Sequence, residues 1–445
     1  MSSDSVASSL DAADAARPTC LLVAVRLPGV EEHELDASLA ELKRLVTTLG
    51  YRVVGKVVQT RQTLAPGAVL GEGKLEELRE LTGAAEVEAG ADENASRRER
   101  READEAEAKI ALVAVDHELQ PSQLRNLEKI VGTDVLDRTG VIIEIFHRHA
   151  QSREAKIQVE IARLSYTAPR ARESPRGKEK HSGRGTGDSA LELDRRRIRD
   201  RIAELKAQLD ALQRVQSVRR AQRQDLRRVA LVGYTNAGKS SLMRALTGSE
   251  VYVQDKLFAT LDTTVRALSP EVKPRILVSD TVGFIKKLPH DLVASFKSTL
   301  DEALEASLLL HVVDASDPNW RSELEVTREV LEEIGATEVS RRLVMNKVDK
   351  VTPEALAAFR AEFPDAWFIC AKDPASVATV HERIVTFFEA SYVQEEFVVP
   401  YAKQRLVSRL HELGRVLEER YEQDGVIVRV QASAEALASV RAELA

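Results

Sequence analysis

Apolar positions in the first 170 residues fall into short continuous runs separated by amphipathic stretches. The apolar runs are residues 21–25, 52–58, 110–115 and 135–136. The stretches with apolar residues at helical spacing are 35–48, 74–81 and 123–131. Because strands that alternate with helices build a parallel sheet with both faces covered, this pattern predicts an α/β domain over residues 19–170. Residues 1–18 are small, polar and acidic, and we expect them to be disordered.

Two stretches interrupt the pattern. Residues 84–109 contain mainly Ala, Glu, Arg and Asp with almost no apolar anchor, which predicts a disordered insertion or a solvated helix. Residues 174–187 are rich in Gly, Lys, Arg and Ser, which is typical of a flexible basic loop.

A basic helical pattern follows this loop, over residues 194–228. Its apolar residues alternate steps of four and three, and they are Ile198, Ile202, Leu205, Leu209 and Leu212. This spacing is that of the seam of an antiparallel helical hairpin or coiled coil. We therefore expect residues 171–227 to be a loop and a helical linker, with arginines facing outward.

The second half of the chain again alternates strand-like and helical segments. Apolar runs at residues 229–232, 276–278 and 343–345 each precede a polar segment, which predicts a second α/β domain over residues 228–391. Beyond it, a helical stretch at 406–421, a turn at Asp424 and Gly425, and a strand at 426–430 predict a small α+β domain over residues 392–445.

The first of these polar segments is a complete phosphate-binding loop. It consists of Gly233, Tyr234, Thr235, Asn236, Ala237, Gly238, Lys239 and Ser240, and a helix is expected from Ser240. Glycines let backbone N–H groups turn towards a polyphosphate, Lys239 reaches the β- and γ-phosphates, and the Ser240 hydroxyl holds Mg²⁺. The positive end of the helix faces the same anion. A surface glycine loop is the competing interpretation, but the strand–loop–helix context is the one that the motif requires.

Three further segments complete a nucleotide site. The second consists of Asp280, Thr281, Val282 and Gly283, the third of Asn346, Lys347, Val348 and Asp349, and the fourth of Cys370, Ala371 and Lys372. Asp280 would reach Mg²⁺ through water, and the Gly283 N–H would sense the γ-phosphate. Asp349 can accept hydrogen bonds from guanine N1 and N2, which adenine does not offer, so the site selects GTP. Each string alone is common, but four in this order predict a Ras-like P-loop G domain rather than a fold that binds nothing.

The loop that should close over the metal lies between the first two motifs. It contains Phe258, Ala259, Thr260, Leu261 and Asp262. A GTPase needs a hydroxyl here that reaches Mg²⁺ when the γ-phosphate is present, and Thr260, Thr263 and Thr264 are all candidates. Phe284 follows Gly283 where Ras-like enzymes carry a Gln that orients the attacking water. We therefore expect slow intrinsic hydrolysis and a partner that completes the site.

Composition limits the remaining possibilities. The net charge of −7 argues against simple coating of nucleic acid, but the basic loop and helix favour an RNA phosphate backbone as partner, with a merely solvated charged face as the alternative. The two cysteines, Cys20 and Cys370, form no disulfide framework, so we expect a reducing cytoplasm. The N-terminus lacks the pattern of a signal peptide, and we expect no integral membrane association.

The chain resembles the HflX-type translational GTPases over nearly its whole length. In the G domain the resemblance rests on residues 258–262, 280–285, 288–290 and 311–316. Towards the N-terminus it rests on residues 71–74, 121–128, 135–139 and 194–198. The resemblance implies that Ser240 and Thr260 ligate Mg²⁺ and that the protein binds the large ribosomal subunit, in splitting of stalled ribosomes or in ribosome assembly. It also implies ATP and RNA contacts at the N-terminal domain, as in some members of the family.

The chain departs from the family pattern in three places. The Gly-rich loop before the linker reads differently over residues 183–192, Cys370 stands where a Ser is usual, and Asp373 and Pro374 stand where Thr and Gly are usual. Backbone contacts to guanine do not depend on these side chains, so we expect nucleotide binding to be kept.

These observations predict a monomeric, ribosome-associated GTPase. We assign catalysis to Lys239, Thr260 and Gly283, and the metal to Ser240 and Thr260. An RNA-binding or RNA-remodelling switch that does not act on ribosomes is the main alternative. A protein–protein signalling switch is a third possibility, and the basic residues from Arg170 to Arg228 argue against it.

Overall fold

The computed structural model describes residues 17–84, 110–170, 190–221, 227–248, 258, 264–286 and 302–444. The chain divides into two compact units, one of residues 1–212 with 288–295 and one of residues 213–287 with 296–445. The expected insertion, apart from Ala84, and the whole of the basic loop 174–187 lie outside the described residues. Among the described residues, no helix has the length and apolar character that crossing a membrane requires.

The first unit contains a four-stranded parallel sheet, as the apolar runs predicted. Its strands are β1 (Thr19–Arg26), β2 (Arg52–Thr60), β3 (Ile110–Val115) and β4 (Asp134–Asp137), in the order β2-β1-β3-β4. Every neighbouring pair in this sheet is parallel. The two central strands, β1 and β3, are almost entirely apolar and buried because both of their faces are covered.

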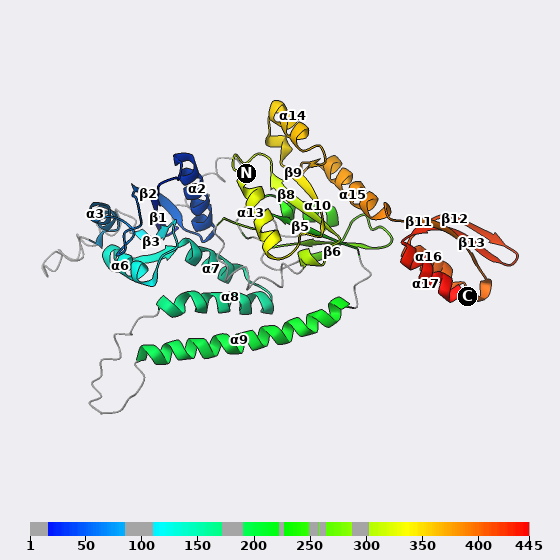
Figure 1. Cartoon of the computed structure of the whole chain (residues 1–445), viewed down its shortest axis with the longest axis horizontal. Helices are drawn as coiled ribbons and strands as arrows, with labels where there is room; N and C mark the ends of the chain where they lie inside the picture. The colour runs from blue at the N-terminus through cyan, green and yellow to red at the C-terminus, as the bar shows by residue number, and fades with distance from the viewer. Residues whose placement is uncertain are drawn as a thin grey trace, which may run out of the picture. The chain divides into compact units, whose positions relative to one another are not determined.

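Four helices enclose this sheet, as Figure 1 shows. They are α2 (Glu32–Thr48), α3 (Glu72–Leu81), α6 (Pro121–Val131) and α7 (Arg138–His149). Leu78 of α3 and Leu127 of α6 pack with Val23 and Val113 in one core. α6 begins with Pro121, and Gly132 caps its C-terminus with a left-handed φ of 64°, which suits a residue without a Cβ.

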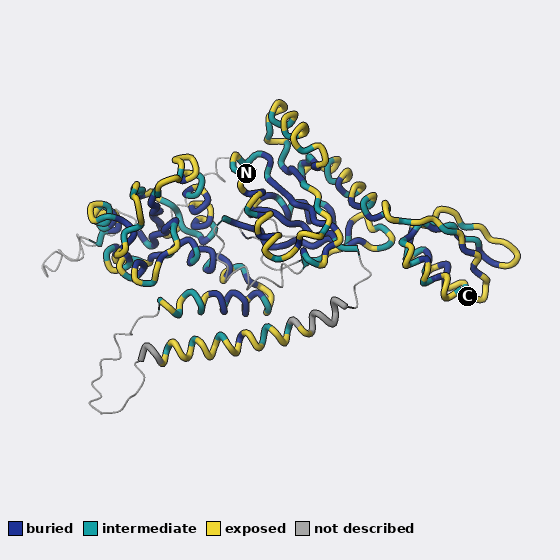
Figure 2. Tube along the Cα trace, in the orientation of Figure 1, coloured by how far each residue is buried: buried dark blue, intermediate teal, exposed yellow. Residues whose placement is uncertain are grey.

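The helical hairpin that the seam predicted is present. α8 (Arg153–Thr167) and α9 (Ala190–Ala221) lie side by side in Figure 1. Ile157 and Ile161 of α8 form a cluster with Leu205 of α9, and the remaining members are Leu164, Ile202, Leu209 and Leu212. Most of α9 is exposed, as Figure 2 shows, because only this seam is covered.

The predicted extent of the basic helix was wrong at its end. α9 ends at Ala221, and Arg227 and Arg228 belong to strand β5 (Arg227–Gly233). Arg227 stacks on the ring of Tyr392 at 4.5 Å, and Arg228 pairs with Glu305. These two arginines therefore make contacts inside the second unit instead of extending the helix.

Buried ionic groups join the carboxyl ends of β3 and β4 to the surrounding helices. Arg138 pairs with Glu41 of α2, and its Nη1 lies 2.8 Å from Oδ1 of Asp116, just after β3. Asp137 accepts a hydrogen bond of 2.8 Å from the hydroxyl of Tyr166 on α8. Burial of such charges is tolerated only when they are paired, so this network fixes α8 against the sheet.

The second unit is built on a six-stranded sheet. After β5 come β6 (Thr264–Ala267), β7 (Ile276–Asp280), β8 (Leu308–Asp314), β9 (Ser340–Asn346) and β10 (Trp367–Phe368), in the order β10-β9-β8-β5-β7-β6. All pairs are parallel except β6 with β7. The carboxyl ends of β5, β7, β8 and β9 therefore meet at one edge of the sheet, where ligands bind in such folds.

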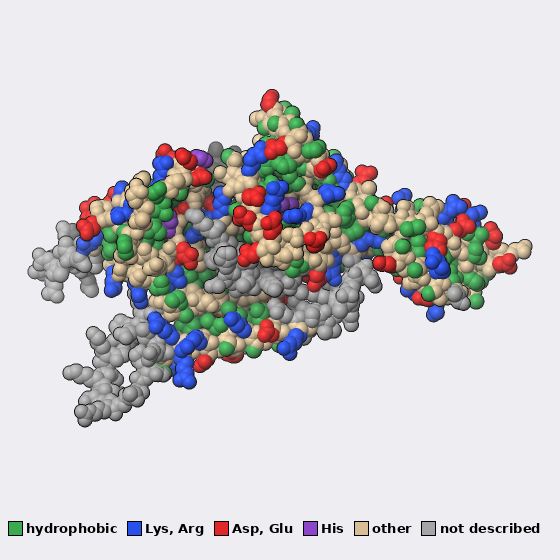
Figure 3. Space-filling model, viewed as in Figure 1, with side chains coloured by type: hydrophobic (Ala, Val, Ile, Leu, Met, Phe, Trp, Pro, Cys, Tyr) green, Lys and Arg blue, Asp and Glu red, His purple; other side chains and the backbone are tan. Residues whose placement is uncertain are grey.

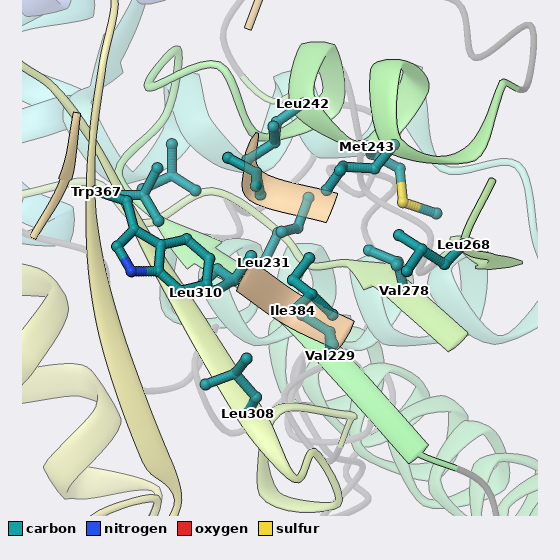
Figure 4. Packing of buried hydrophobic residues seen from close by; sticks show 14 of the residues in the cluster. Val229, Leu231, Leu242, Met243, Leu268, Val278, Leu308, Leu310, Trp367 and Ile384 are labelled. Carbon is teal, nitrogen blue, oxygen red and sulfur yellow. The ribbon is translucent and has the colours of Figure 1, made fainter. Parts of the chain in front are cut away.

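Helices cover both faces of this sheet. α10 (Lys239–Thr247) and α15 (Pro374–Glu389) share one core with the strands, and Figure 4 shows Leu242, Met243 and Ile384 packed against Leu231 and Leu310. On the other face α13 (Trp320–Glu333) and α14 (Pro353–Glu362) meet where Trp320 contacts Phe359 edge to face at 5.3 Å. α10 begins at Lys239, one residue earlier than predicted.

The C-terminal part is an α+β layer, but its predicted elements were partly wrong. Its strands are β11 (Val393–Val399), β12 (Arg415–Glu422) and β13 (Gly425–Ala432), in the antiparallel order β11-β13-β12. Its helices are α16 (Arg405–Leu413) and α17 (Ala434–Leu444). The predicted helix 406–421 therefore ends at Leu413, and the rest pairs with β13. Gly414 separates the two in an extended conformation that leaves no room for a Cβ, since that atom would lie 2.6 Å from Ala432 Cβ.

Candidate functional site

The phosphate-binding loop leaves the end of β5 and enters α10, as its motif requires. The Lys239 side chain is buried, and its ammonium donates hydrogen bonds to the carbonyls of Gly233 at 2.9 Å and Tyr234 at 2.8 Å. Burial lowers the pKa of Lys239 to about 8, while Asp280 and Glu323 oppose the shift. The loop thus curves around a cation held at its centre, which is the geometry that a polyphosphate needs.

The Asp280 segment is paired with this loop backbone to backbone. Thr235 N donates to Phe284 O at 2.8 Å, and Phe284 N donates to Gly233 O at 3.1 Å. A Cβ on Gly283 would lie 2.8 Å from Thr235 Cγ2 and 3.0 Å from Lys239 Nζ. Only glycine allows this approach, which brings the Gly283 backbone beside the lysine that would meet phosphate.

The side chain of Phe284 is buried inside the protein. It has no polar group, so it has nothing with which to hold a water molecule beside the phosphate loop. This placement agrees with the expectation from the sequence that position 284 does not orient the attacking water.

Two oxygen groups that could bind a metal ion, a hydroxyl and a carboxylate, face each other beside the phosphate loop. The Ser240 hydroxyl donates to Asp280 Oδ2 at 2.7 Å, and Asp280 is buried at the end of β7. A hydroxyl and a carboxylate are hard oxygen ligands of the kind that Mg²⁺ takes alongside phosphate oxygens. The residues present therefore fit a magnesium ion. Among the described residues, no cluster of three or more His, Cys, Asp or Glu side chains forms a separate metal site.

The base segments are fastened to the same loop. Asn346 Nδ2 donates to Ala237 O at 2.9 Å, and Asn346 Oδ1 accepts from Ala371 N at 3.0 Å. Lys347 Nζ donates to Asn236 O at 2.8 Å. The third motif is thus bonded directly to the phosphate loop. The fourth motif is linked to that loop through Asn346, which contacts both.

The residue predicted to select the base lies at the edge of this site. Asp349 is exposed in the short helix η3 (Val348–Lys350), and Lys372 is exposed beyond β10. Burial, and after it a hydrogen bond to Asp349, raises the pKa of the Cys370 thiol. Cys370 therefore lies beside Asp349, in the position from which its thiol can steady that carboxylate.

Most of the predicted closing loop lies outside the described residues. Ala259, Thr260, Leu261, Asp262 and Thr263 lie outside the described residues, as do residues 288–290. Phe258 is buried with a left-handed φ of 56°, and Thr264 begins β6. The choice among the three threonines therefore stays a prediction from the family resemblance.

Two contacts of the site were not predicted from the sequence. Asp314, to which the sequence analysis assigned no role at the site, lies 2.7 Å from Lys347 Nζ through its Oδ2. The Tyr234 hydroxyl accepts a hydrogen bond of 2.7 Å from Lys286 N and so holds the segment after Phe284. The position of Asp314 at the carboxyl end of β8, next to β9, is the signal that could have placed it at the site.

The arginines of α9 form a second candidate surface. Arg195, Arg196, Arg197, Arg199 and Arg201 are all exposed. Figure 3 shows Lys and Arg side chains along this helix. Some of these cations have acidic neighbours, since Arg197 pairs with Asp194 and Arg201 with Glu160. The helix nevertheless carries an excess of positive charge in a chain whose net charge is −7.

Three family models match successive parts of the chain between residues 36 and 347. A family model described as "50S ribosome-binding GTPase" matches residues 228–347. Models described as "GTP-binding GTPase Middle Region" and "GTP-binding GTPase N-terminal" match residues 149–223, and residues 36–91 with 96–147.

Curated relatives match over nearly their full length. A protein of Gluconacetobacter diazotrophicus named GTPase HflX is 56% identical over 96% of this chain and 98% of its own. The GTPase HflX of Escherichia coli is 36% identical over 91% of each chain. A solved GTP-binding protein of Sulfolobus solfataricus in complex with GDP is 21% identical over 82% of this chain and 99% of its own, with a TM-score of 0.43, too low to support an inference.

Proposed function

The chain belongs to the HflX family of GTPases, and from that premise we propose that it hydrolyses GTP with Mg²⁺ while bound to the large ribosomal subunit. Hydrolysis of GTP follows from the family and from the G domain. The partner, the metal and the roles of individual residues are our proposals. We propose the large ribosomal subunit as the partner because the family model that matches the G domain is described as a 50S ribosome-binding GTPase.

The phosphate end of GTP would be held by the loop between β5 and α10. Lys239 would turn from the carbonyls of Gly233 and Tyr234 to the β- and γ-phosphates. Ser240, Asp280 through water, and Thr260 from the closing loop would hold Mg²⁺, which when bound neutralises phosphate charge. The Gly283 N–H, kept beside Lys239 by the backbone pairing, would donate to the γ-phosphate.

The base would be read by the third and fourth motifs. The exposed Asp349 carboxylate would accept from guanine N1 and N2, and the backbone at Ala371 would face guanine O6. Asn346 would keep both motifs at a fixed distance from the phosphate loop through Ala237 and Ala371. The site therefore favours GTP over ATP, because adenine offers no pair of donors to the Asp349 carboxylate, and a site that forms hydrogen bonds with a base discriminates against the base that lacks them.

The observation that carries the partner-dependent mechanism is the burial of Phe284 at the position that should orient water. With no polar group there, an isolated protein should hydrolyse GTP slowly, and the missing group must come from elsewhere in the enzyme or from a partner, of which we favour the partner. The exposed arginines of α9 supply a surface suited to a ribosomal RNA backbone. Action in ribosome splitting, rescue or assembly is the cellular role that we propose from the family.

Sedimentation tests the choice of partner. The protein is centrifuged with purified large subunits, with small subunits and with an unrelated structured RNA, in the presence of a non-hydrolysable GTP analogue or of GDP. We expect cosedimentation with large subunits that is stronger with the GTP analogue. Equal retention by the unrelated RNA would favour the RNA-remodelling alternative and contradict the proposal.

A further inference from the structure

A carboxylate outside the four nucleotide motifs contacts one of them directly. Asp314 is the last residue of β8, and its Oδ2 lies 2.7 Å from Lys347 Nζ. The side chains of Asp314 and Lys347 are 13% and 21% exposed, so the pair is largely shielded from solvent. Such a pair is screened less than one on an open surface, and its charge can matter to the site.

The Lys347 ammonium also contacts the phosphate loop. Lys347 Nζ donates to Asn236 O at 2.8 Å, and the neighbouring Asn346 donates to Ala237 O at 2.9 Å. Two consecutive side chains of the base motif therefore hold two consecutive carbonyls of the phosphate loop. Lys347 and Asn236 both have left-handed backbones, with φ of 61° and 62°, which residues with a Cβ adopt only when neighbouring contacts support them.

Hydrogen bonds to the second carboxylate oxygen of Asp314 fix the orientation of this side chain. Oδ1 accepts from Ser316 N at 3.0 Å and from the Ser316 hydroxyl at 2.6 Å, which leaves Oδ2 directed at Lys347. A lysine side chain has a flexible four-carbon stem and a strongly hydrated ammonium. A single carbonyl would not hold it in one place, but a carbonyl on one side and a fixed carboxylate on the other restrict it to the position between them.

We propose that Asp314 is a positioning residue for nucleotide binding: it holds Lys347 against Asn236 and so keeps the base motif and the phosphate loop in register. The inference rests on the nucleotide site proposed above. Asp314 acts through Lys347 and the loop backbone and touches no part of the γ-phosphate site at Gly283. Its loss should therefore weaken GDP and GTP binding by the same factor.

The test is the dissociation rate of fluorescent mant-GDP and mant-GTP from the full chain carrying Asp314→Asn. The amide is isosteric and keeps an oxygen for Ser316, but it removes the charge that faces Lys347. Because a charge-assisted hydrogen bond is lost, dissociation should be about tenfold faster for both nucleotides, which corresponds to about 1.4 kcal/mol. Asp317→Asn is the matched control on the same loop: Asp317 accepts from Asn319 N at 2.9 Å, and we expect wild-type rates.

A double-mutant cycle tests whether Asp314 acts through Lys347. In a Lys347→Met background, Asp314→Asn should add less than about twofold, because the partner of the carboxylate is already gone. An undiminished tenfold effect in that background would overturn the proposal, as would a single Asp314→Asn variant with wild-type rates.

Asp349→Asn, measured in parallel, separates this proposal from the one on which it rests. If Asp349→Asn weakens guanine binding while Asp314→Asn does not, only the role of Asp314 is wrong. If both variants keep wild-type rates, the nucleotide site itself is misassigned, and the role of Asp314 is wrong with it.

Discussion

Lys239 should give nucleotide affinity a defined dependence on pH. Burial lowers the pKa of its ammonium to about 8 in the protein without nucleotide. Only the protonated side chain attracts phosphate oxygens, so affinity should be nearly constant below pH 8 and fall as the pH rises above it. The protonated fraction falls from about 0.9 at pH 7 to about 0.1 at pH 9, which predicts a roughly tenfold loss of affinity.

The sign follows from which form each state prefers. Burial favours the neutral amine in the free protein, whereas a bound polyphosphate favours the ammonium and raises its pKa again. Binding at pH 9 should therefore take up close to one proton, and binding at pH 6.5 almost none. Isothermal titration calorimetry with GDP, in two buffers of different ionisation enthalpy, measures both the affinity and the proton uptake.

Lys239→Arg is the matched control, because guanidinium keeps its proton throughout this range. Guanine N1 also loses its proton in alkaline solution, and it does so equally in both proteins. The difference in slope between wild type and Lys239→Arg therefore isolates the lysine. Identical slopes and identical proton uptake in the two proteins would refute the reasoning.

Four substitutions test the rest of the site. Asp349→Asn should weaken GTP binding and relax it towards xanthosine triphosphate, because the amide presents a donor where guanine N2 also donates; unchanged affinities for both nucleotides in a competition assay would show that the base pocket is elsewhere. Thr260→Ala should spare GDP and weaken binding of a GTP analogue, whereas Lys239→Ala should lose both; equal losses of GDP and GTP in Thr260→Ala would contradict the closing role. Gly238→Ala should abolish tight binding of either nucleotide, because its Cβ would lie 2.2 Å from Asn346 Nδ2 and break the link to Ala237, and wild-type affinity would contradict that link.

The fold could be predicted from the sequence wherever burial imposed a pattern. The apolar runs in β1, β3, β5 and β7 could be predicted because both faces of each sheet are covered. The α8–α9 seam was predictable because Leu205 and its neighbours must repeat at helical spacing to stay covered. The predicted α+β character of the C-terminal part was right for the same reason.

The pattern failed where strands are exposed. β12 reads as a helix because residues 415–422 carry mostly charged side chains, and most of them are exposed, so no alternation of burial marks the strand. The contacts that stabilise it are backbone hydrogen bonds to β13, which local sequence does not encode.

The candidate site was predictable as motifs but not as a network. Four strings, each near the end of a strand, place Lys239, Asp280, Asn346 and Cys370 at one sheet edge. The Asp314–Lys347 pair is not part of any such string: the end of β8 could have placed Asp314 near the site, but not its contact with Lys347. The order β9-β8-β5, which brings those residues together, is a property of the sheet and not of either motif.

Ribosome-stimulated GTP turnover tests the central claim most directly. The rate of the full chain is measured alone and with purified large subunits, at low salt and at increasing salt. We expect slow intrinsic turnover and a stimulation of about 10³ to 10⁵, which corresponds to roughly 4–7 kcal/mol of barrier, falling as salt rises. Glu in place of Arg195, Arg196 and Arg197 should reduce the stimulation and leave intrinsic turnover unchanged. A turnover rate that large subunits do not alter at low salt would contradict the account.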